Sequence, residues 1–243
     1  MDEIILRFAE IDYKLPFAFV RGTGEHTFLF GLENDQRRIR VKNFLISKYT
    51  VTQVLWKHVM GYNPSNAVND HKPVEMVSFD DVTSFLQKLN ENMILNMHVL
   101  EQMREETFYK FRLPSETEWE YAARGGIYWG DYFLFSGSDN IDEVVWYKHN
   151  SNNETKIVGQ KKPNQLGIYD MCGNIWEWCA DYFQRDTNKI PRDGSACIAE
   201  SNDHVLRGGC FHNYGIHCTV MKRYEIGADT RDPCIGFRLV LSA

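Results

Sequence analysis

Five motifs, the last four of them rich in Trp, Gly or Arg, follow one another along the chain, and their order constrains the fold more than any other feature. They cover residues 47–53 (SKYTVTQ), 112–126 (RLPSETEWEYAARGG), 173–178 (GNIWEW), 207–209 (RGG) and 236–238 (GFR). The Gly doublets indicate turns rather than phosphate-binding loops, because no GxxxxGK[ST] or strand-flanked GxGxxG pattern is present. From residue 128 onward, Gly, Asn, Asp and aromatic residues separate short apolar runs. This composition predicts a loop-rich C-terminal half joined by short strands.

The N-terminal half alternates apolar and charged residues, as strands do. Residues 28–31 and 39–46 predict two strands around a turn at Asn34 and Asp35. The first residues of the chain predict an added strand.

Helix starts are marked by capping residues. Ser78 with Asp81, and Ser115 with Glu118, have the spacing of a capping box, in which each residue satisfies the other's backbone N–H. A shorter helix is predicted over residues 52–60, with a Thr at its start and a Gly after its end.

Composition narrows the classes of function. The formal net charge is −6 with both signs interspersed, so no basic stripe favours nucleic acid as a partner. No apolar run approaches the ~20 residues that a transmembrane helix needs. The first seven residues lack the basic and apolar regions of a secretory signal peptide, so we expect a cytoplasmic or phage-encoded protein. No linker divides the chain, and we expect a single domain over residues 1–243.

The motif order resembles the formylglycine-generating enzyme (sulfatase-modifying factor) family over residues of about 28–240. The resemblance implies an α+β, C-type lectin-like fold with short strands, few helices and a loop-rich C-terminal half. Residues of about 90–110 are longer and more polar than the family pattern, which indicates an insertion.

The same resemblance implies structural calcium, an ion that prefers oxygen ligands. One calcium site would use Asp170, the backbone carbonyls of Gly173 and Ile175, and the Glu177 carboxylate. A second site would include Asn140 and Ile141. The alternative is that these polar groups satisfy loop backbone groups without any metal ion.

Catalysis in this family depends on two cysteines that bind copper(I). The six cysteines of this chain form no CxxC pair, which disfavours a zinc site, and we expect free thiols. The second catalytic position falls on Cys218, but the first falls on Asn213, and an amide cannot replace a thiolate in a copper(I) site. A copper-dependent oxidase that uses Cys218 with Cys210 stays as the alternative to a non-catalytic protein.

The segment 210–235 mixes aromatic, apolar, thiol and polar residues with no helical or strand period. It resembles the variable region of diversity-generating retroelement proteins, in which mutagenesis of AAC codons never yields Lys, Glu, Gln, Met or Trp. Residues 210–220 contain none of these five types, whereas Met221, Lys222 and Glu225 do not fit the pattern.

We therefore expect a display surface that binds a protein or a cell-surface ligand. The expected contact residues are Cys210, His212, Asn213, Tyr214, Ile216, His217, Tyr224, Asp229, Arg231 and Asp232. A structural subunit with one fixed partner is a further alternative.

Overall fold

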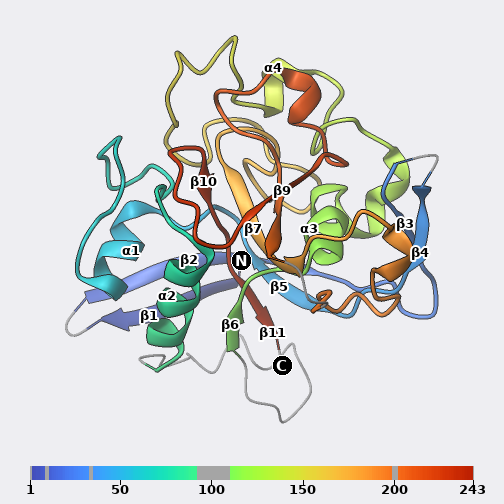
Figure 1. Ribbon diagram of the computed structural model, residues 1–243, viewed down its shortest axis with the longest axis horizontal. Helices are drawn as coiled ribbons and strands as arrows, with labels where there is room; N and C mark the ends of the chain where they lie inside the picture. Colours follow the sequence, from blue (N-terminus) through green and yellow to red (C-terminus); the bar gives the residue numbers. More distant parts are fainter. Residues whose placement is uncertain (1, 9–10, 33–34, 92–109, 199–201, 243) are drawn as a thin grey trace.

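The computed structural model describes residues 2–8, 11–32, 35–91, 110–198 and 202–242 (Figure 1). Most of the insertion expected near residues 90–110 therefore lies outside the described residues. Among those that are described, no helix combines the length and the apolar character needed to cross a bilayer.

The N-terminal half and the C-terminus share an antiparallel sheet with the order β1-β2-β5-β11-β6. Its strands are β1 (Asp2–Phe8), β2 (Ile11–Val20), β5 (Phe44–Ser47), β6 (Lys110–Arg112) and β11 (Val240–Ser242). Strand β1 confirms the added strand at the start of the chain.

The hairpin predicted around residues 34 and 35 is only partly correct. Strands β3 (Phe28–Phe30) and β4 (Arg37–Ile39) do pair with each other. However, the predicted second strand over residues 39–46 is two strands, because β4 ends at Ile39 and β5 pairs with β2 and β11 in the other sheet. The apolar residues Ile39, Val41 and Phe44 continue the strand pattern across the gap, so the sequence does not show that the chain passes from one sheet to another there. Asn34 lies outside the described residues.

Three helices begin where the capping residues predict them: α1 (Gln53–Met60), α2 (Phe79–Glu91) and α3 (Glu116–Ala123). The one-turn α4 (Ile141–Val144) is not predicted from the sequence. Short 3₁₀ helices are η3 (Gly126–Asp131), η4 (Thr187–Lys189) and η5 (Gly215–His217).

Both predicted capping boxes are confirmed. The Ser78 N–H donates to Asp81 Oδ2 (2.9 Å), and the Asp81 N–H donates to Ser78 Oγ (3.1 Å). Ser115 and Glu118 exchange the same pair of bonds at the start of α3. Thr52 does precede α1, but its hydroxyl bonds to the hydroxyl of Tyr13 (3.0 Å) instead of capping the helix.

The C-terminal half contains a second sheet with the order β10-β7-β8-β9. Its strands are β7 (Trp176–Tyr182), β8 (Asp203–Arg207), β9 (Arg223–Gly227) and β10 (Ile235–Gly236). Long loops connect these strands, as the composition predicts (Figure 1).

The register of this sheet brings three motifs side by side. Glu177 is paired with Arg207 across the antiparallel β7–β8 ladder and with Gly236 across the parallel β7–β10 ladder. The GNIWEW, RGG and GFR motifs therefore meet at one place, although about 60 residues separate the first from the last. Residues 210–235, which connect RGG to GFR, therefore start and end at the point where the three motifs meet.

Candidate ligand-binding surface

The segment 210–235 is supported at its C-terminal end by a fully buried ion pair. Arg238 donates from Nε to Glu177 Oε2 (2.7 Å) and from Nη2 to Glu177 Oε1 (2.8 Å). Trp119 Nε1 also donates to Glu177 Oε2 (2.7 Å). Because a buried charge is tolerated only when it is paired and hydrogen-bonded, these three residues depend on one another.

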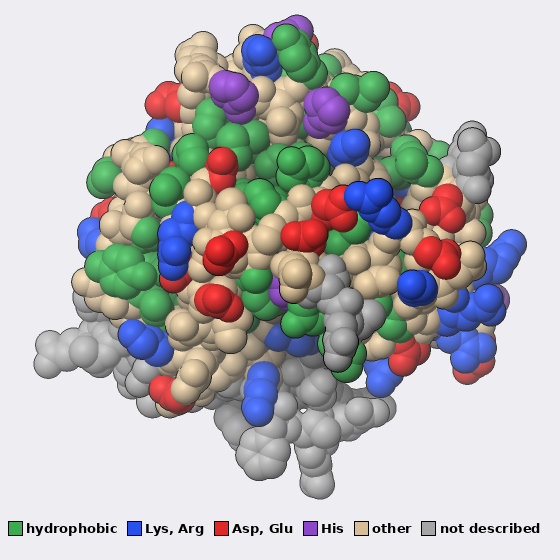
Figure 2. Space-filling model, viewed as in Figure 1, with side chains coloured by type: hydrophobic (Ala, Val, Ile, Leu, Met, Phe, Trp, Pro, Cys, Tyr) green, Lys and Arg blue, Asp and Glu red, His purple; other side chains and the backbone are tan. Residues whose placement is uncertain are grey.

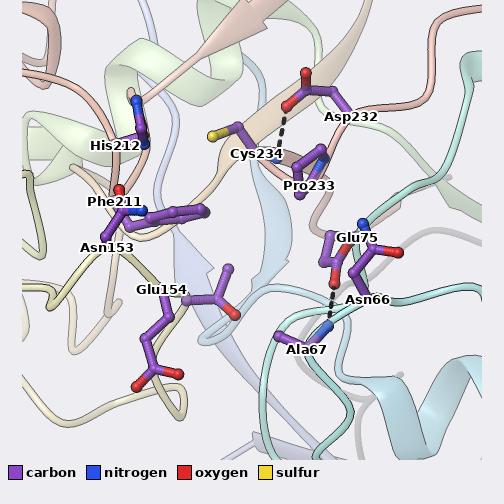
Figure 3. A pocket seen from close by; sticks show the side chains of 11 residues that line it. Asn66, Ala67, Glu75, Asn153, Glu154, Phe211, His212, Asp232, Pro233 and Cys234 are labelled. Carbon is purple, nitrogen blue, oxygen red and sulfur yellow. Dashed lines mark hydrogen bonds between the residues drawn. The ribbon is translucent and has the colours of Figure 1, made fainter.

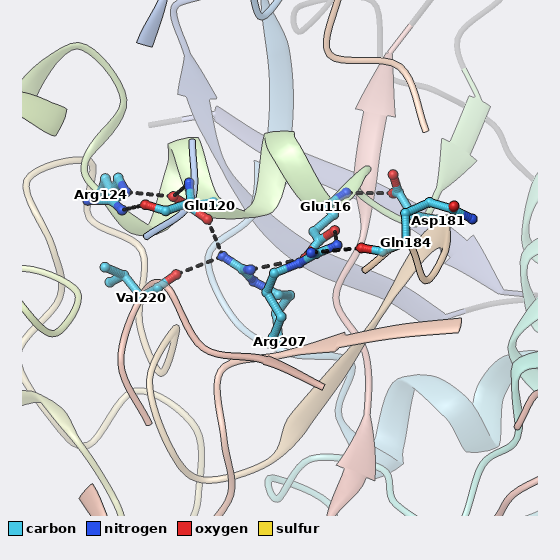
Figure 4. Close-up of polar contacts among 9 residues, drawn as sticks. Glu116, Glu120, Arg124, Asp181, Gln184, Arg207 and Val220 are labelled. Carbon is cyan, nitrogen blue, oxygen red and sulfur yellow. Dashed lines mark hydrogen bonds and ion pairs between the residues drawn. The ribbon is translucent and has the colours of Figure 1, made fainter. Parts of the chain in front are cut away.

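A second buried network fixes the start of the segment (Figure 4). Arg207 pairs with Glu116 (3.0 Å) and Glu120 (2.5 Å) of α3, and it donates to the carbonyl of Val220 (2.8 Å). Arg223 of β9 binds the same Glu116 carboxylate. Helix α3 therefore binds Arg207 and Arg223 directly, and Arg207 in turn holds the carbonyl of Val220.

The loop after RGG turns back on itself at once. Gly209 has φ +76°, and a Cβ there would lie 2.6 Å from the carbonyl oxygen of His217, so only Gly allows this close approach. The Asn213 side chain accepts a hydrogen bond from the Cys210 N–H (2.9 Å), and the Asn213 N–H donates to the Cys210 carbonyl (3.0 Å). Asn213 is half-buried and holds the turn.

Most side chains expected to contact a ligand are accessible to solvent. Ile216 is 76% exposed, Tyr214 is 52% exposed and Tyr224 is 49% exposed. The exposed set also includes His212, Asp229 and Arg231, and the half-buried set includes Asn213, His217 and Asp232. Figure 2 shows histidine and hydrophobic side chains gathered at the top of this face, over α4 and the loops around it.

Two of the exposed aromatic residues are held by neighbours. The Tyr214 hydroxyl accepts a hydrogen bond from Lys148 Nζ (3.2 Å), and His149 meets the Tyr214 ring edge-on at 5.7 Å. Tyr224 stacks on Trp176 at 5.5 Å. Such rigid aromatic rings give contact area at little entropic cost, as in antibody binding sites.

Two expected contact residues have other roles. Cys210 is only 1% exposed and its sulfur lies against that of Cys234, so in this structure its side chain packs inside the protein instead of facing a ligand. Arg231 is exposed, but it forms a double hydrogen bond with Asp81 of α2 (2.7 and 2.8 Å). Burial alone would raise the pKa of Asp81, but the bonds from Arg231 and Ser78 lower it overall.

A pocket of about 450 Å³ opens beside this segment (Figure 3). Phe211 points into its centre, and Glu75 lies on the opposite wall. Its lining consists of Asn66, Ala67, Glu75, Asn153, Glu154, Thr155, Phe211, His212, Asp232, Pro233 and Cys234. The sequence did not predict the contributions from residues 66–75 and 153–155. The one available signal was Glu75, an acid within the apolar run PVEMV.

The cysteines of the segment 210–235 lie close together, and each sulfur has a different neighbour. The Cys218 sulfur is buried and faces the carbonyl oxygens of Cys210 (3.9 Å) and Tyr214 (3.8 Å), and burial raises the pKa of this thiol. The Cys210 sulfur lies 2.7 Å from the Cys234 sulfur. The amide of Asn213, at the first catalytic position of the family, holds the turn.

Of the residues expected at the first calcium site, Asp170 has an oxygen without a partner, whereas Glu177 and the Gly173 carbonyl are already hydrogen-bonded. Asp170 Oδ2 accepts a hydrogen bond from the Gly159 N–H (2.7 Å), whereas Oδ1 is buried without a hydrogen-bond partner in the structure. Burial raises the pKa of Asp170 to about 6. Asp170 therefore has an oxygen free for a cation. Glu177 uses both carboxylate oxygens in the pair with Arg238, and the Gly173 carbonyl accepts from the Ile175 N–H (2.8 Å).

At the second expected calcium site, Asn140 and Ile141 are engaged in helix α4. Asn140 Oδ1 accepts from the Asp142 N–H (3.2 Å), and the Ile141 carbonyl accepts from the Val145 N–H (2.9 Å). Within the part of the chain that the structure describes, no group of three or more His, Cys, Asp or Glu is arranged to hold a metal ion.

The mixed α+β architecture, with a loop-rich half whose motifs meet at buried ion pairs, defines a C-type lectin-like fold of the formylglycine-generating type. Residues 18–243 match the model of the sulfatase-modifying factor enzyme 1-like domain, and the chain belongs to this family.

Known relatives agree with this assignment. The chain is 35% identical over 221 residues to the chaperone protein LppX of Paenibacillus barcinonensis, which covers 74% of this chain and 79% of that protein. It is 28% identical over 206 residues to the formylglycine-generating enzyme of Streptomyces coelicolor, which covers 75% of this chain. The match spans only 57% of that enzyme's length.

Among solved structures, Treponema denticola variable protein 1 has a TM-score of 0.82 to this chain at 25% sequence identity. The superposition covers 99% of both chains, so the likeness extends over the segment 210–235 as well as over the scaffold.

Proposed function

We propose that this protein is a non-catalytic binding protein whose segment 210–235 presents a contact surface to a protein or cell-surface ligand. The observation that carries the proposal is the contrast within this segment. Its outer side chains, such as Tyr214, Ile216 and Tyr224, are exposed, whereas its ends are fixed by the fully buried Arg207 and Arg238. A rigid base with freely placed outer side chains is the arrangement of a binding loop on a scaffold.

The likeness to a protein named as a variable protein supports a finer proposal, that the contact residues differ between copies of the gene. Exposed residues tolerate substitution at little cost in stability, typically within ~0.5 kcal/mol, whereas the buried arginines do not. The test is to read the DNA beside the gene for a reverse transcriptase and a near-identical template repeat. If no repeat exists, a fixed partner replaces the variable one.

The non-catalytic part of the proposal rests on the donors at the family's catalytic positions. A thiol with a raised pKa at Cys218 and an amide at Asn213 supply no thiolate pair for copper(I). The protein, supplied with copper and a cysteine-containing sulfatase peptide, should leave the peptide's mass unchanged. Conversion of the cysteine to formylglycine, lost in Cys218→Ser, would establish the oxidase instead.

We also propose calcium as a structural ion at Asp170. The support is the buried Oδ1 atom without a partner, since carboxylate oxygens are preferred calcium ligands. Such an ion would stabilise the turn at Asp170, whose φ of +56° is unusual for a residue other than Gly.

A test of the binding proposal is to capture ligands from cell-surface extracts on the immobilised protein. The matched bait carries Tyr214→Ser, Ile216→Ser and Tyr224→Ser. A ligand of the proposed surface is retained by the native protein and released by this variant. A ligand retained equally by both baits binds elsewhere and contradicts the proposal.

A further inference from the structure

We propose that the pocket beside Phe211 binds one cationic group, the ammonium of a lysine or the guanidinium of an arginine on the ligand. This inference deepens the proposed function and rests on it, because the pocket opens within the contact surface. It assigns a chemical class to the part of the ligand that enters the pocket.

The first support is Glu75, which is 1% exposed and lines the pocket. Its Oε1 accepts a hydrogen bond from the Ala67 N–H (2.9 Å), whereas its Oε2 is buried without a hydrogen-bond partner in the structure. A buried carboxylate oxygen without a donor is costly. A ligand that brings both a hydrogen-bond donor and a positive charge would compensate that cost.

The second support is Thr155, which also lines the pocket. It is buried, and its Oγ1 also has no hydrogen-bond partner in the structure. An ammonium has three donors and a guanidinium has five, so either group has enough donors for both the Thr155 hydroxyl oxygen and the Glu75 carboxylate. Native proteins leave few buried polar atoms unsatisfied, and two on one pocket indicate a polar ligand.

The charges around the pocket select a cation. Burial raises the pKa of Glu75, and the charge of Asp232 adds to this, whereas the backbone N–H groups of Ala67 and Asn66 and the charge of Lys72 favour the charged carboxylate. Lys72 pairs with Glu154 (3.2 Å), and Lys156 pairs with the same carboxylate (2.9 Å). Because two lysines share the one Glu154 carboxylate, this group keeps one positive charge, and the carboxylates of Glu75 and Asp232 leave a net negative charge at the pocket.

The Phe211 ring adds a surface suited to a cation. It points into the centre of the pocket (Figure 3), where a cation can lie over the face of the ring. Arginine and lysine also carry apolar stems, which can pack against Phe211 and Pro233 while the charged end reaches Glu75. A neutral apolar side chain would leave both unsatisfied oxygens without a donor.

The experiment titrates the full chain with N-acetyl-lysine methylamide, N-acetyl-arginine methylamide and the neutral isostere N-acetyl-norleucine methylamide, followed by two-dimensional NMR. At least one cationic probe should shift pocket resonances saturably and bind at least tenfold more tightly than norleucine. The lysine and arginine arms identify which cation is preferred. Equal binding of all three probes, or no binding of either cation, overturns the inference.

Two isosteric variants locate the binding. Glu75→Gln keeps the Oε1 acceptor for Ala67 but removes the charge, and it should weaken cation binding at least tenfold. Thr155→Val removes only a hydroxyl without a partner and should weaken binding by a smaller factor. Glu143→Gln, an exposed acid paired with Lys162, is the control and should leave binding unchanged.

Stability separates a binding role from a structural one. If Glu75 is kept for binding, Glu75→Gln should melt at the same temperature as the native protein or higher. A lower melting temperature with unchanged cation affinity would make Glu75 structural and overturn the inference. If Glu75→Gln does not fold, Thr155→Val decides: unchanged affinity overturns the inference. A further combination of results is that the cation probes fail to bind while the triple variant at Tyr214, Ile216 and Tyr224 still loses the captured ligand. That combination would overturn the inference about the pocket and leave the proposed function intact.

Discussion

At the residue scale, the acids and arginines of the motifs matter because they are buried together. The sequence identifies Glu177 and Arg238 as motif residues, but it does not show that they form a pair, because 61 positions separate them. Because charged side chains are usually exposed, a sequence pattern places them at the surface, and only the tertiary fold shows that they are paired in the interior. For the same reason, the sequence predicts Glu177 as a calcium ligand, whereas the structure shows its carboxylate bound to arginine.

The first prediction concerns Arg238→Met. The change leaves the Glu177 carboxylate buried with only the Trp119 N–H as a donor, so the free energy of unfolding should fall by about 3–5 kcal/mol. Arg185→Met is the control, because the Arg185–Glu225 pair is exposed and should contribute about 0–1 kcal/mol. Urea denaturation measures both. Equal losses in the two variants would contradict the structural role of the buried pair.

The second prediction concerns pH and Asp181, which accepts hydrogen bonds from the N–H groups of Cys197 (2.8 Å) and Glu116 (2.6 Å). Burial, together with the charge of Glu116, raises the pKa of Asp181 from 3.8 to about 7. The folded state therefore binds more protons than the unfolded state between these values, and its stability from this group falls as pH rises through them.

The measurement is the free energy of unfolding of the native protein minus that of Asp181→Asn, followed against pH. The difference should decrease from about pH 4 to about pH 7 and stay constant above that range, because Asn does not titrate. A difference that grows with pH would mean that the carboxylate is stabilised as an anion in the fold.

At the element scale, features made by neighbouring residues are predicted well from the sequence, whereas contacts between distant segments are not. The capping boxes at Ser78 and Ser115 are correct because each is made by residues three positions apart. The pocket is not predicted, because loops around Glu75 and Thr155 reach Phe211 only through the tertiary fold. The lack of a period in the segment 210–235 predicts a loop, but it misses strand β9 within the segment, because β9 is formed by long-range pairing with β8.

The third prediction concerns the ends of this segment, where the sulfurs of Cys210 and Cys234 lie 2.7 Å apart. Oxidised glutathione should convert the two thiols to a disulfide, releasing two molecules of glutathione. The bond would close a 24-residue loop and raise the free energy of unfolding by about 3 kcal/mol in the chain-entropy model. Mass spectrometry should find a loss of two hydrogen atoms.

Cys234→Ser should abolish this mass change, and Cys218→Ser should not, because the Cys218 sulfur faces backbone carbonyls. A disulfide that includes Cys218 in the native protein would contradict the arrangement of the loop.

At the scale of the whole molecule, the order of the motifs predicts the α+β, C-type lectin-like fold. Glu177 lies between Arg207 and Gly236 in one sheet, so three motifs that are far apart in the sequence meet at the buried ion pairs. What the motifs leave open is the surface, because exposed residues are not fixed by packing. The partner is therefore a matter for experiment.

The fourth prediction concerns calcium. If Asp170 holds a structural ion, excess calcium should raise the melting temperature by mass action and a chelator should lower it. Asp170→Asn should abolish this response while keeping an oxygen that can accept from the Gly159 N–H. A melting temperature that changes by less than about a degree between chelator and calcium would exclude the ion.

The central claim is that the outer side chains of residues 210–235 bind a ligand, and it is tested most directly by the affinity of a captured and purified ligand for three proteins. One is native, one carries Tyr214→Ser, Ile216→Ser and Tyr224→Ser, and one carries the matched exposed changes Tyr128→Ser, Ile127→Ser and Tyr132→Ser near η3. We expect the first triple variant to lose at least a hundredfold in affinity and the second to lose none, with similar melting temperatures. Equal affinity of the two variants, or a loss confined to the η3 variant, would contradict the account.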